Sequence, residues 1–141
     1  RIKTDIFAED LKSNIKDEMP EYSTVPFDLV HNVNYEYFKL LINGKCHFDD
    51  FYESIQKDKN SLDAFDKIIS MMDDFSPRLR LPFTKFRHIE GVGRNDVYEF
   101  KCRNIRIYVV MQAPDIYVVI GGVKGKQDKT LRWLRQSLNE F

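Results

Sequence analysis

The sequence predicts an α+β domain, in which an antiparallel β-sheet meander is packed by a two-helix hairpin and followed by a C-terminal helix. Three observations support this fold class. A length of 141 residues suits a single core, apolar residues recur at helical spacing in the first half of the chain, and short segments from residue 85 onward alternate with a period of two. No apolar run approaches the roughly 20 residues that cross a bilayer, so no membrane partner is expected.

Residues 1–33 are interpreted as an acidic extension that precedes the domain proper at residues 34–141. The extension holds 4 Lys and Arg against 7 Asp and Glu. Phe7, Leu11 and Ile15 are spaced four apart, which predicts a short helix over residues 4–19. The segment 21–32 lacks a period and is expected to be a loop. Because a solitary helix cannot bury its apolar stripe, we expect it to dock, either on the helical layer or over a basic site of the same chain.

The domain is expected to begin with a strand over residues 34–42 that ends at the turn pair Asn43-Gly44. Two amphipathic helices follow at about 47–58 and 61–75. Their apolar stripes are Phe48, Phe51, Tyr52 and Ile55 in the first helix, and Leu62, Phe65, Ile68, Ile69 and Met72 in the second. Asn60 or Ser61 is the expected N-cap of the second helix, and Pro77 lies just past its end.

Four short segments then alternate as strands do, namely KFRHIEG, VYEFKC, NIRIYVVMQ and IYVVIGGVK. Their links are short and rich in Gly, Asn, Pro and Asp, which predicts an antiparallel meander. The chain closes with a helix that we expect Asp128 to cap, with a leucine stripe at Leu131, Leu134 and Leu138. The residues expected in the core include Leu62, Phe65, Ile69, Val109, Val118 and Ile120.

No nucleotide or metal cofactor is indicated. The glycines of GGVKGKQ lack the spacing of a phosphate-binding loop, and no Ser or Thr follows the lysine. The histidines and cysteines show no ligand spacing; they are His31, His47, His88, Cys46 and Cys102. Two cysteines are also too few for a disulfide scaffold, which favours the cytoplasm.

The net charge of zero conceals an opposition between the two halves of the chain. Residues 1–77 hold 9 Lys and Arg against 16 Asp and Glu, whereas residues 78–141 hold 13 against 6. A basic half of this size can attract a polyanion. It can equally be a solvated face that pairs with the acidic half, and composition alone leaves both interpretations open.

Basic residues of the meander are predicted to converge. Strand alternation places Glu99, Lys101 and Arg103 on the face opposite to that of Tyr98, Phe100 and Cys102. Arg106 follows on the next strand. If the strands pair as a meander, the converging residues are Glu99, Lys101, Arg106, Lys124 and Lys126, and Lys85 and Arg87 can extend them. Such a cluster suits an RNA backbone. The alternative, that edge-strand lysines only prevent aggregation, explains Lys85 but not Arg106.

The order strand, helix, helix, four-stranded meander and C-terminal helix resembles the RelE/ParE superfamily of toxins from bacterial type II toxin–antitoxin systems. The resemblance covers about residues 35–138. It rests on PRLRLPFTKFRHIEG, DVYEFKC, IRIYVVMQ and IYVVIGGVKGKQDK, and on the helix that closes the chain. INGKCHFDDFYESI and VIGGVKGKQDKTLRWLR resemble versions from Bacteroides-type bacteria.

The resemblance implies a microbial-RNase-like sheet and a metal-independent endoribonuclease that cuts mRNA on the ribosome by attack of a 2′-OH on phosphate. It implies two partners, a cognate antitoxin and the ribosome with its mRNA. Lys101 and Arg106 match family residues by position, and Lys124 or Lys126 matches the basic residue past the fourth strand. Glu99 stands where some members have a lysine, and it is expected either to act as a base or to orient Arg106. The expected catalytic residues are therefore Lys101, Arg106, Glu99 and Lys126. The residues expected to bind RNA are Lys85, Arg87, Arg103, Lys124 and Lys129.

The sequence departs from the family pattern at the C-terminus. Many active members carry Tyr or His in the last segment, whereas residues 124–141 hold neither. Two alternatives therefore stand beside the endoribonuclease: a ParE-like toxin that binds DNA gyrase, and a catalytically degenerate member of the superfamily.

Overall fold

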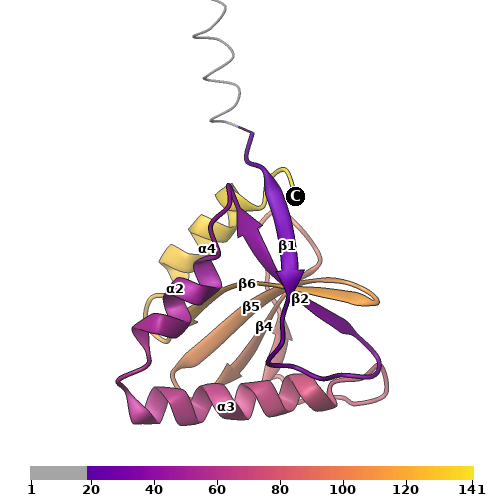
Figure 1. Cartoon of the computed structure of the whole chain (residues 1–141), viewed down its shortest axis with the longest axis vertical. Helices are drawn as coiled ribbons and strands as arrows, with labels where there is room; N and C mark the ends of the chain where they lie inside the picture. The colour runs from indigo at the N-terminus through magenta and orange to yellow at the C-terminus, as the bar shows by residue number, and fades with distance from the viewer. Residues whose placement is uncertain (1–18) are drawn as a thin grey trace, which may run out of the picture.

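The computed structural model describes residues 19–141, which form a six-stranded mixed sheet with helices on both faces (Figure 1). The strand order is β1-β2-β6-β5-β4-β3. The elements are β1 (Tyr22–Pro26), β2 (Glu36–Ile42), α2 (His47–Ser54), α3 (Lys59–Asp74), β3 (Phe86–His88), β4 (Val97–Cys102), β5 (Ile105–Gln112), β6 (Asp115–Val123) and α4 (Gln127–Ser137). The α+β class is confirmed. The helix expected over 4–19, with Phe7, Leu11 and Ile15, lies outside the described residues apart from its last position.

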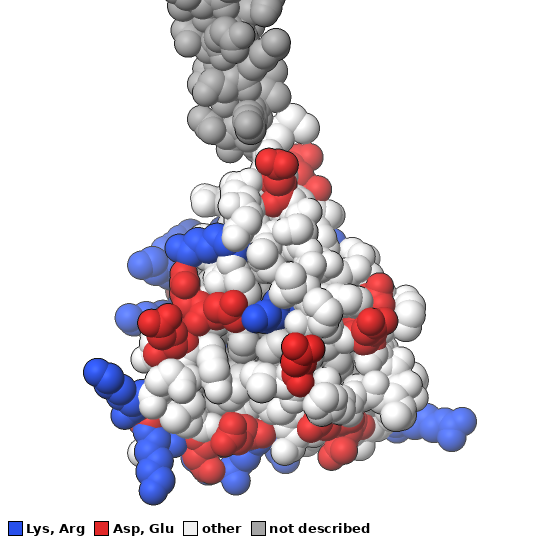
Figure 2. Space-filling view, viewed as in Figure 1, with Lys and Arg blue, Asp and Glu red and all other residues white. Residues whose placement is uncertain are grey.

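Strand β1 corrects the expectation of a loop over residues 21–32. It pairs antiparallel with β2, from Tyr22 opposite Ile42 to Pro26 opposite Phe38. The strand lies at the sheet edge, where proline is tolerated and where four of its five side chains are exposed. Because β1 does not bury every second side chain, its sequence does not alternate between apolar and polar residues. Figure 2 shows that this part of the surface is mostly uncharged.

Strand β2 and the turn after it are confirmed. Asn43 and Gly44 have positive φ angles of 53° and 78°, the left-handed conformation that this residue pair adopts readily. Strand β2 pairs in parallel with β6, so the sheet is mixed rather than an antiparallel meander alone. The chain between β2 and β6, which includes α2, α3 and strands β3 to β5, is long enough to permit this parallel pairing.

Helix α3 begins earlier than the sequence predicts. Its N-cap is Asp58, whose carboxylate accepts hydrogen bonds from the Asn60 backbone N–H at 3.1 Å and from the Ser61 hydroxyl at 2.8 Å. Asn60 and Ser61 are therefore donors to the cap, and the expectation that either is the cap itself is wrong. The helix ends at Asp74, before Pro77, as predicted.

Helices α2 and α3 cover one face of the sheet. They meet through aromatic rings, with centroids 4.9 Å apart for Tyr52 and Phe65 and 5.9 Å apart for Phe48 and Phe65. Figure 1 shows α3 running along the base of the molecule and α2 rising beside it. On the sheet side, a Cβ at Gly121 would overlap the Phe51 ring, so glycine permits the close approach of α2 to β6.

The antiparallel meander of β3, β4, β5 and β6 is confirmed. Helix α4 packs on the other face through Leu134 and Leu138, which are fully buried. Its N-cap is Lys126, with Asp128 in the first turn, so the expected Asp128 cap is wrong by two positions. Of the predicted core, Phe65, Val109 and Val118 are buried, and the others pack partly buried against it; these are Leu62, Ile69 and Ile120.

Among residues 19–141, no helix combines the length and the apolar character that a membrane span requires.

Candidate functional site

A charged group lies on the α4 face of the sheet, where strands β3, β4 and β5 run side by side. Across these strands, Arg87 lies opposite Glu99, and Lys101 lies opposite Arg106. We call Arg87, Glu99, Lys101 and Arg106 the polar cluster. The prediction that Glu99, Lys101 and Arg106 converge is confirmed by this register.

Glu99 is the centre of the polar cluster. Its side chain is fully buried, and one carboxylate oxygen, Oε2, accepts a hydrogen bond from Arg87 Nε at 2.7 Å. The other oxygen, Oε1, accepts a hydrogen bond from Gln127 Nε2 of α4 at 3.4 Å and lies 3.7 Å from Arg106 Nε. A buried carboxylate is costly unless it is paired, and here two guanidinium groups pair with it. Glu99 therefore holds both arginines in place.

Arg106 is nearly buried, with 8% of its side chain exposed. Its Nη1 donates hydrogen bonds to the backbone carbonyls of Arg103 at 2.6 Å and Ile105 at 3.1 Å. Its buried Nε has no hydrogen-bond partner among the described residues. Arg106 therefore braces the turn between β4 and β5 while its charge remains beside Glu99.

The ionisation of Lys101 is affected by its surroundings. Burial lowers the pKa of its amine below the ordinary value, and the positive charge of Arg87 adds to this effect. The buried Tyr108, opposite Glu99, shows the reverse shift. Burial raises the pKa of its phenol, and the Glu99 carboxylate raises it further, so the phenol stays protonated at neutral pH.

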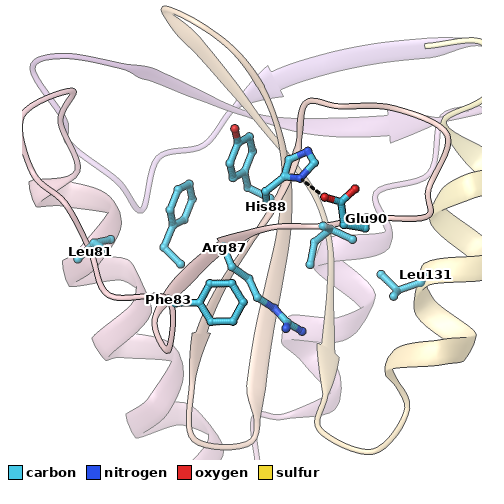
Figure 3. Close-up of a pocket in the computed structure, with 9 residues that line it drawn as sticks. Leu81, Phe83, Arg87, His88, Glu90 and Leu131 are labelled. Carbon is cyan, nitrogen blue, oxygen red and sulfur yellow. Dashed lines mark ion pairs between the residues drawn. The ribbon is translucent and has the colours of Figure 1, made fainter.

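A groove of about 680 Å³ runs along the β3 edge beside the polar cluster (Figure 3). Its lining includes Phe83, Arg87 and His88, and it reaches Leu131 of α4. His88 Nδ1 lies 3.5 Å from Glu90 Oε1 at one side of the groove. The lining of the groove is therefore partly apolar and partly charged. Arg87 belongs both to this lining and to the polar cluster.

Two of the other expected RNA-binding residues border this region. The backbone carbonyl of Lys85 accepts from the Lys101 N–H at 2.8 Å, so the two lysines are neighbours on adjacent strands. The Lys124 N–H donates to the Asn104 carbonyl at 2.8 Å, which places Lys124 next to the β4–β5 turn. Both side chains are exposed.

Three expected residues lie away from the polar cluster. Arg103 Nη1 pairs with Asp63 of α3 at 2.8 Å, which directs its side chain to the opposite face of the sheet. Lys126 and Lys129 line a second groove, of about 390 Å³, between α2 and α4, together with Trp133. Gln127 instead reaches Glu99, so α4 separates Lys126 and Lys129 from the polar cluster.

The sequence analysis missed three residues of the site, namely Phe83, Tyr108 and Gln127. Tyr108 could have been found, because alternation along β5 places it on the same face as Arg106. Phe83 stands in the basic segment RLRLPFTK, where an aromatic residue among cations is itself a signal. Nothing in the sequence around Gln127 indicates that it reaches Glu99.

Within residues 19–141, no three His, Cys, Asp or Glu side chains are grouped closely enough to hold a metal ion. No protein-family model matches the sequence, and no curated protein or solved structure matches the chain.

Proposed function

We propose that this protein is an RNA-binding toxin of the RelE/ParE type that cleaves mRNA, and that the polar cluster is its phosphate site. One observation carries the proposal: the polar cluster combines three cations with a single, fully buried carboxylate that pairs with two of them, which leaves two positive charges in excess within the cluster. An RNA backbone is the partner that such a site favours. The cytoplasmic ribosome with its mRNA, and a cognate antitoxin, are the partners that this proposal implies.

The element order also supports the proposal. A strand, two helices, an antiparallel meander and a final helix follow one another along the chain, as the resemblance to the superfamily leads one to expect. Strand β1 is an addition to that order.

The residues of the polar cluster divide into contact and positioning roles. Arg87 and Lys101 border open surface and bind the phosphate, whereas Glu99 and Arg106 hold them in place. Lys101 accepts the proton of the ribose 2′-OH when its amine is neutral, and the lowered pKa increases the fraction of the amine in that form. The 2′ oxygen then attacks phosphorus, the bond to the 5′ oxygen breaks, and that oxygen takes a proton from water. Arg87 stabilises the charge on the phosphate oxygens.

Substitution of Lys101 separates binding from cleavage. Lys101→Arg keeps the positive charge but removes the proton acceptor, because a guanidinium does not deprotonate in proteins. We expect RNA affinity close to that of the wild type and a cleavage rate lower by about 10²- to 10⁴-fold. Lys101→Ala should lose both. The matched control is Lys67→Ala, an exposed lysine of α3 on the opposite face of the sheet.

The readouts are growth after induced expression, mRNA cleavage in a translation reaction, and affinity of the purified chain for a short single-stranded RNA. Full toxicity and cleavage in both Lys101 variants would place the activity elsewhere.

A second candidate is the ParE-like toxin that binds DNA gyrase. It is favoured by the state of Glu99, whose two oxygens are already occupied by Arg87 and Gln127 and therefore offer no free base. A supercoiling assay distinguishes the candidates. Inhibition of gyrase with intact mRNA would select the second and reject the endoribonuclease.

A further inference from the structure

We infer that the groove along β3 binds a base of single-stranded RNA, which stacks on Phe83 while its phosphate lies on Arg87 and Lys101. The inference rests on the proposed function, since that function supplies the RNA, and it adds a residue and a role that the polar cluster alone does not contain. Phe83 belongs to the loop that connects α3 to β3.

The exposure of Phe83 is the first observation. Its side chain is 68% exposed, the second most exposed of the large apolar residues among those that the structure describes. Val33 is more exposed, but it is an aliphatic residue on a loop and has no aromatic ring. A phenylalanine left in water at a groove is available to a flat apolar partner.

The charges beside Phe83 are the second observation. Arg87 Cζ lies 5.6 Å from the centroid of the ring, and Lys101 Nζ lies 5.7 Å from it. Figure 3 shows the ring of Phe83 next to the Arg87 side chain, inside the groove. An exposed aromatic ring close to two cations suits single-stranded nucleic acid, because bases stack on such rings and phosphates meet the cations.

The groove has walls and charge that fit this occupant. Its volume of about 680 Å³ lies within the range of ligand pockets. Phe86 and Tyr98 form part of its lining, with parallel rings whose centroids are 5.1 Å apart. Glu90, on the other side of Arg87 from Phe83 in Figure 3, repels phosphate. The phosphate is therefore directed to the Arg87 and Lys101 end, beside Phe83.

Charge decides between a base and an apolar protein side chain as the occupant. An apolar protein side chain carries no charge to pair with Arg87 and Lys101, whereas a nucleotide carries one phosphate for each base. The groove is therefore assigned to RNA, and an apolar contact that does not need a ring becomes an outcome of the test.

The test compares three substitutions of Phe83 in the full chain, namely Phe83→Leu, Phe83→Trp and Phe83→Ala. Phe83→Leu keeps an apolar side chain without a ring, Phe83→Trp keeps a ring, and Leu79→Ala is the matched control in the same loop, where Leu79 is 40% exposed. We expect Phe83→Leu to weaken binding of a short single-stranded RNA by about 5- to 100-fold, and Phe83→Trp to retain it. The salt dependence of binding should be unchanged in Phe83→Leu, because the phosphate contacts remain.

Each outcome bears on the inference. Phe83→Leu with wild-type affinity overturns the base site but leaves the proposed function standing, as long as Lys101→Ala still weakens binding. Phe83→Leu with wild-type affinity and Phe83→Ala with a large loss indicates an apolar contact that does not need a ring, which also overturns the base site. A wild-type chain that binds no RNA overturns both. Because Phe83 is mostly exposed, urea unfolding of each variant should match the wild type, which excludes misfolding as the cause.

Discussion

The two faces of the sheet are built from the same strands but follow different rules. On the face covered by α2 and α3, β5 contributes Ile105, Ile107 and Val109, all fully buried. On the face covered by α4, the alternate residues of the same strand include Arg106 and Tyr108. One face is a continuous apolar core. The other is apolar where Leu134 and Leu138 pack and charged near the start of α4, where Gln127 reaches Glu99.

The difference follows from how far α4 reaches. Its buried leucines pack in a core that contains Val97 and Val110, at one end of the β4 and β5 pair. Glu99, Lys101 and Arg106 occupy the other end of that pair, toward the β4–β5 turn. A buried ion pair adds little net stability compared with apolar residues of similar size. The proposed function accounts for charges at this place by phosphate binding, whereas the residues of the opposite face form the core.

Among the substitutions that compare the two faces, Glu99→Ala is expected to change the free energy of unfolding the most. The substitution leaves Arg87 and Arg106 without their buried counter-charge, so the free energy of unfolding should fall by about 3–5 kcal/mol. Urea unfolding monitored by circular dichroism measures it. Glu90→Ala is the control, because that side chain is 89% exposed and its loss should change stability by less than about 0.5 kcal/mol. Equal stability of the two variants would mean that the polar cluster is solvated.

The next effect compares neighbouring glycines that face opposite sides of the sheet. A Cβ at Gly121 would overlap the Phe51 ring of α2, whereas a Cβ at Gly122 would lie 3.5 Å from Thr130 Oγ1 of α4, an ordinary contact. Gly121→Ala should therefore lower the free energy of unfolding by about 1–3 kcal/mol, with a smaller change for Gly122→Ala. Thermal or urea unfolding tests this order. The double variant with Phe51→Ala should lose less than the two single losses combined, since the overlap is removed.

Most of the fold could be predicted from the sequence because its signals are local. The helical stripe of α3 and the alternation of β4, β5 and β6 each arise from side chains buried on one side of an element. Strand β1 could not be predicted, because its side chains remain exposed at an edge and the strand is held by backbone pairing with β2. The parallel pairing of β2 with β6 is likewise a long-range contact that no local period encodes.

For the candidate site, the sequence could predict only which residues of a strand share a face. Alternation brought Glu99 and Lys101 to one face, and the short turn placed Arg106 opposite Lys101. The direction of a long side chain at a turn or a helix start is decided by tertiary neighbours. For this reason, Arg103 pairs with Asp63, and Lys126 lies on the side of α4 that is away from the polar cluster.

A pH-dependent contribution to the free energy of unfolding, of moderate size, is expected from the ion pair of Arg94 and Asp96. Arg94 donates hydrogen bonds to Asp96 and, through Nη1, to the carbonyls of Leu138 and Phe141 at 3.1 and 2.9 Å. The hydrogen bond from Arg94 lowers the pKa of Asp96 below its ordinary value of 3.8. This stabilisation is therefore fully present above the ordinary pKa and is lost as the pH falls below it.

Asp96→Asn tests this contribution. The partly exposed pair should account for about 0.5–1 kcal/mol, so the variant should be less stable than the wild type by that amount at neutral pH and should approach it in acid. Urea unfolding at several pH values measures the difference. A constant difference at all pH values would show that the effect is one of packing and not of charge.

The smallest effect is expected for Arg103→Ala, which tests whether the cations of the two faces are equivalent. The Arg103 to Asp63 ion pair is about half exposed on both sides, at 48% and 54%, so its loss should change stability by less than about 0.5 kcal/mol. Because this side chain is directed to α3, RNA affinity and its salt dependence should also be unchanged, whereas Arg87→Ala should reduce the salt slope for single-stranded RNA by about 0.7. Fluorescence anisotropy at several salt concentrations compares the two. Equal losses of affinity and slope would show that RNA passes over both faces of the β4–β5 turn, and the division between a folding face and a binding face would then fail at this end of the sheet.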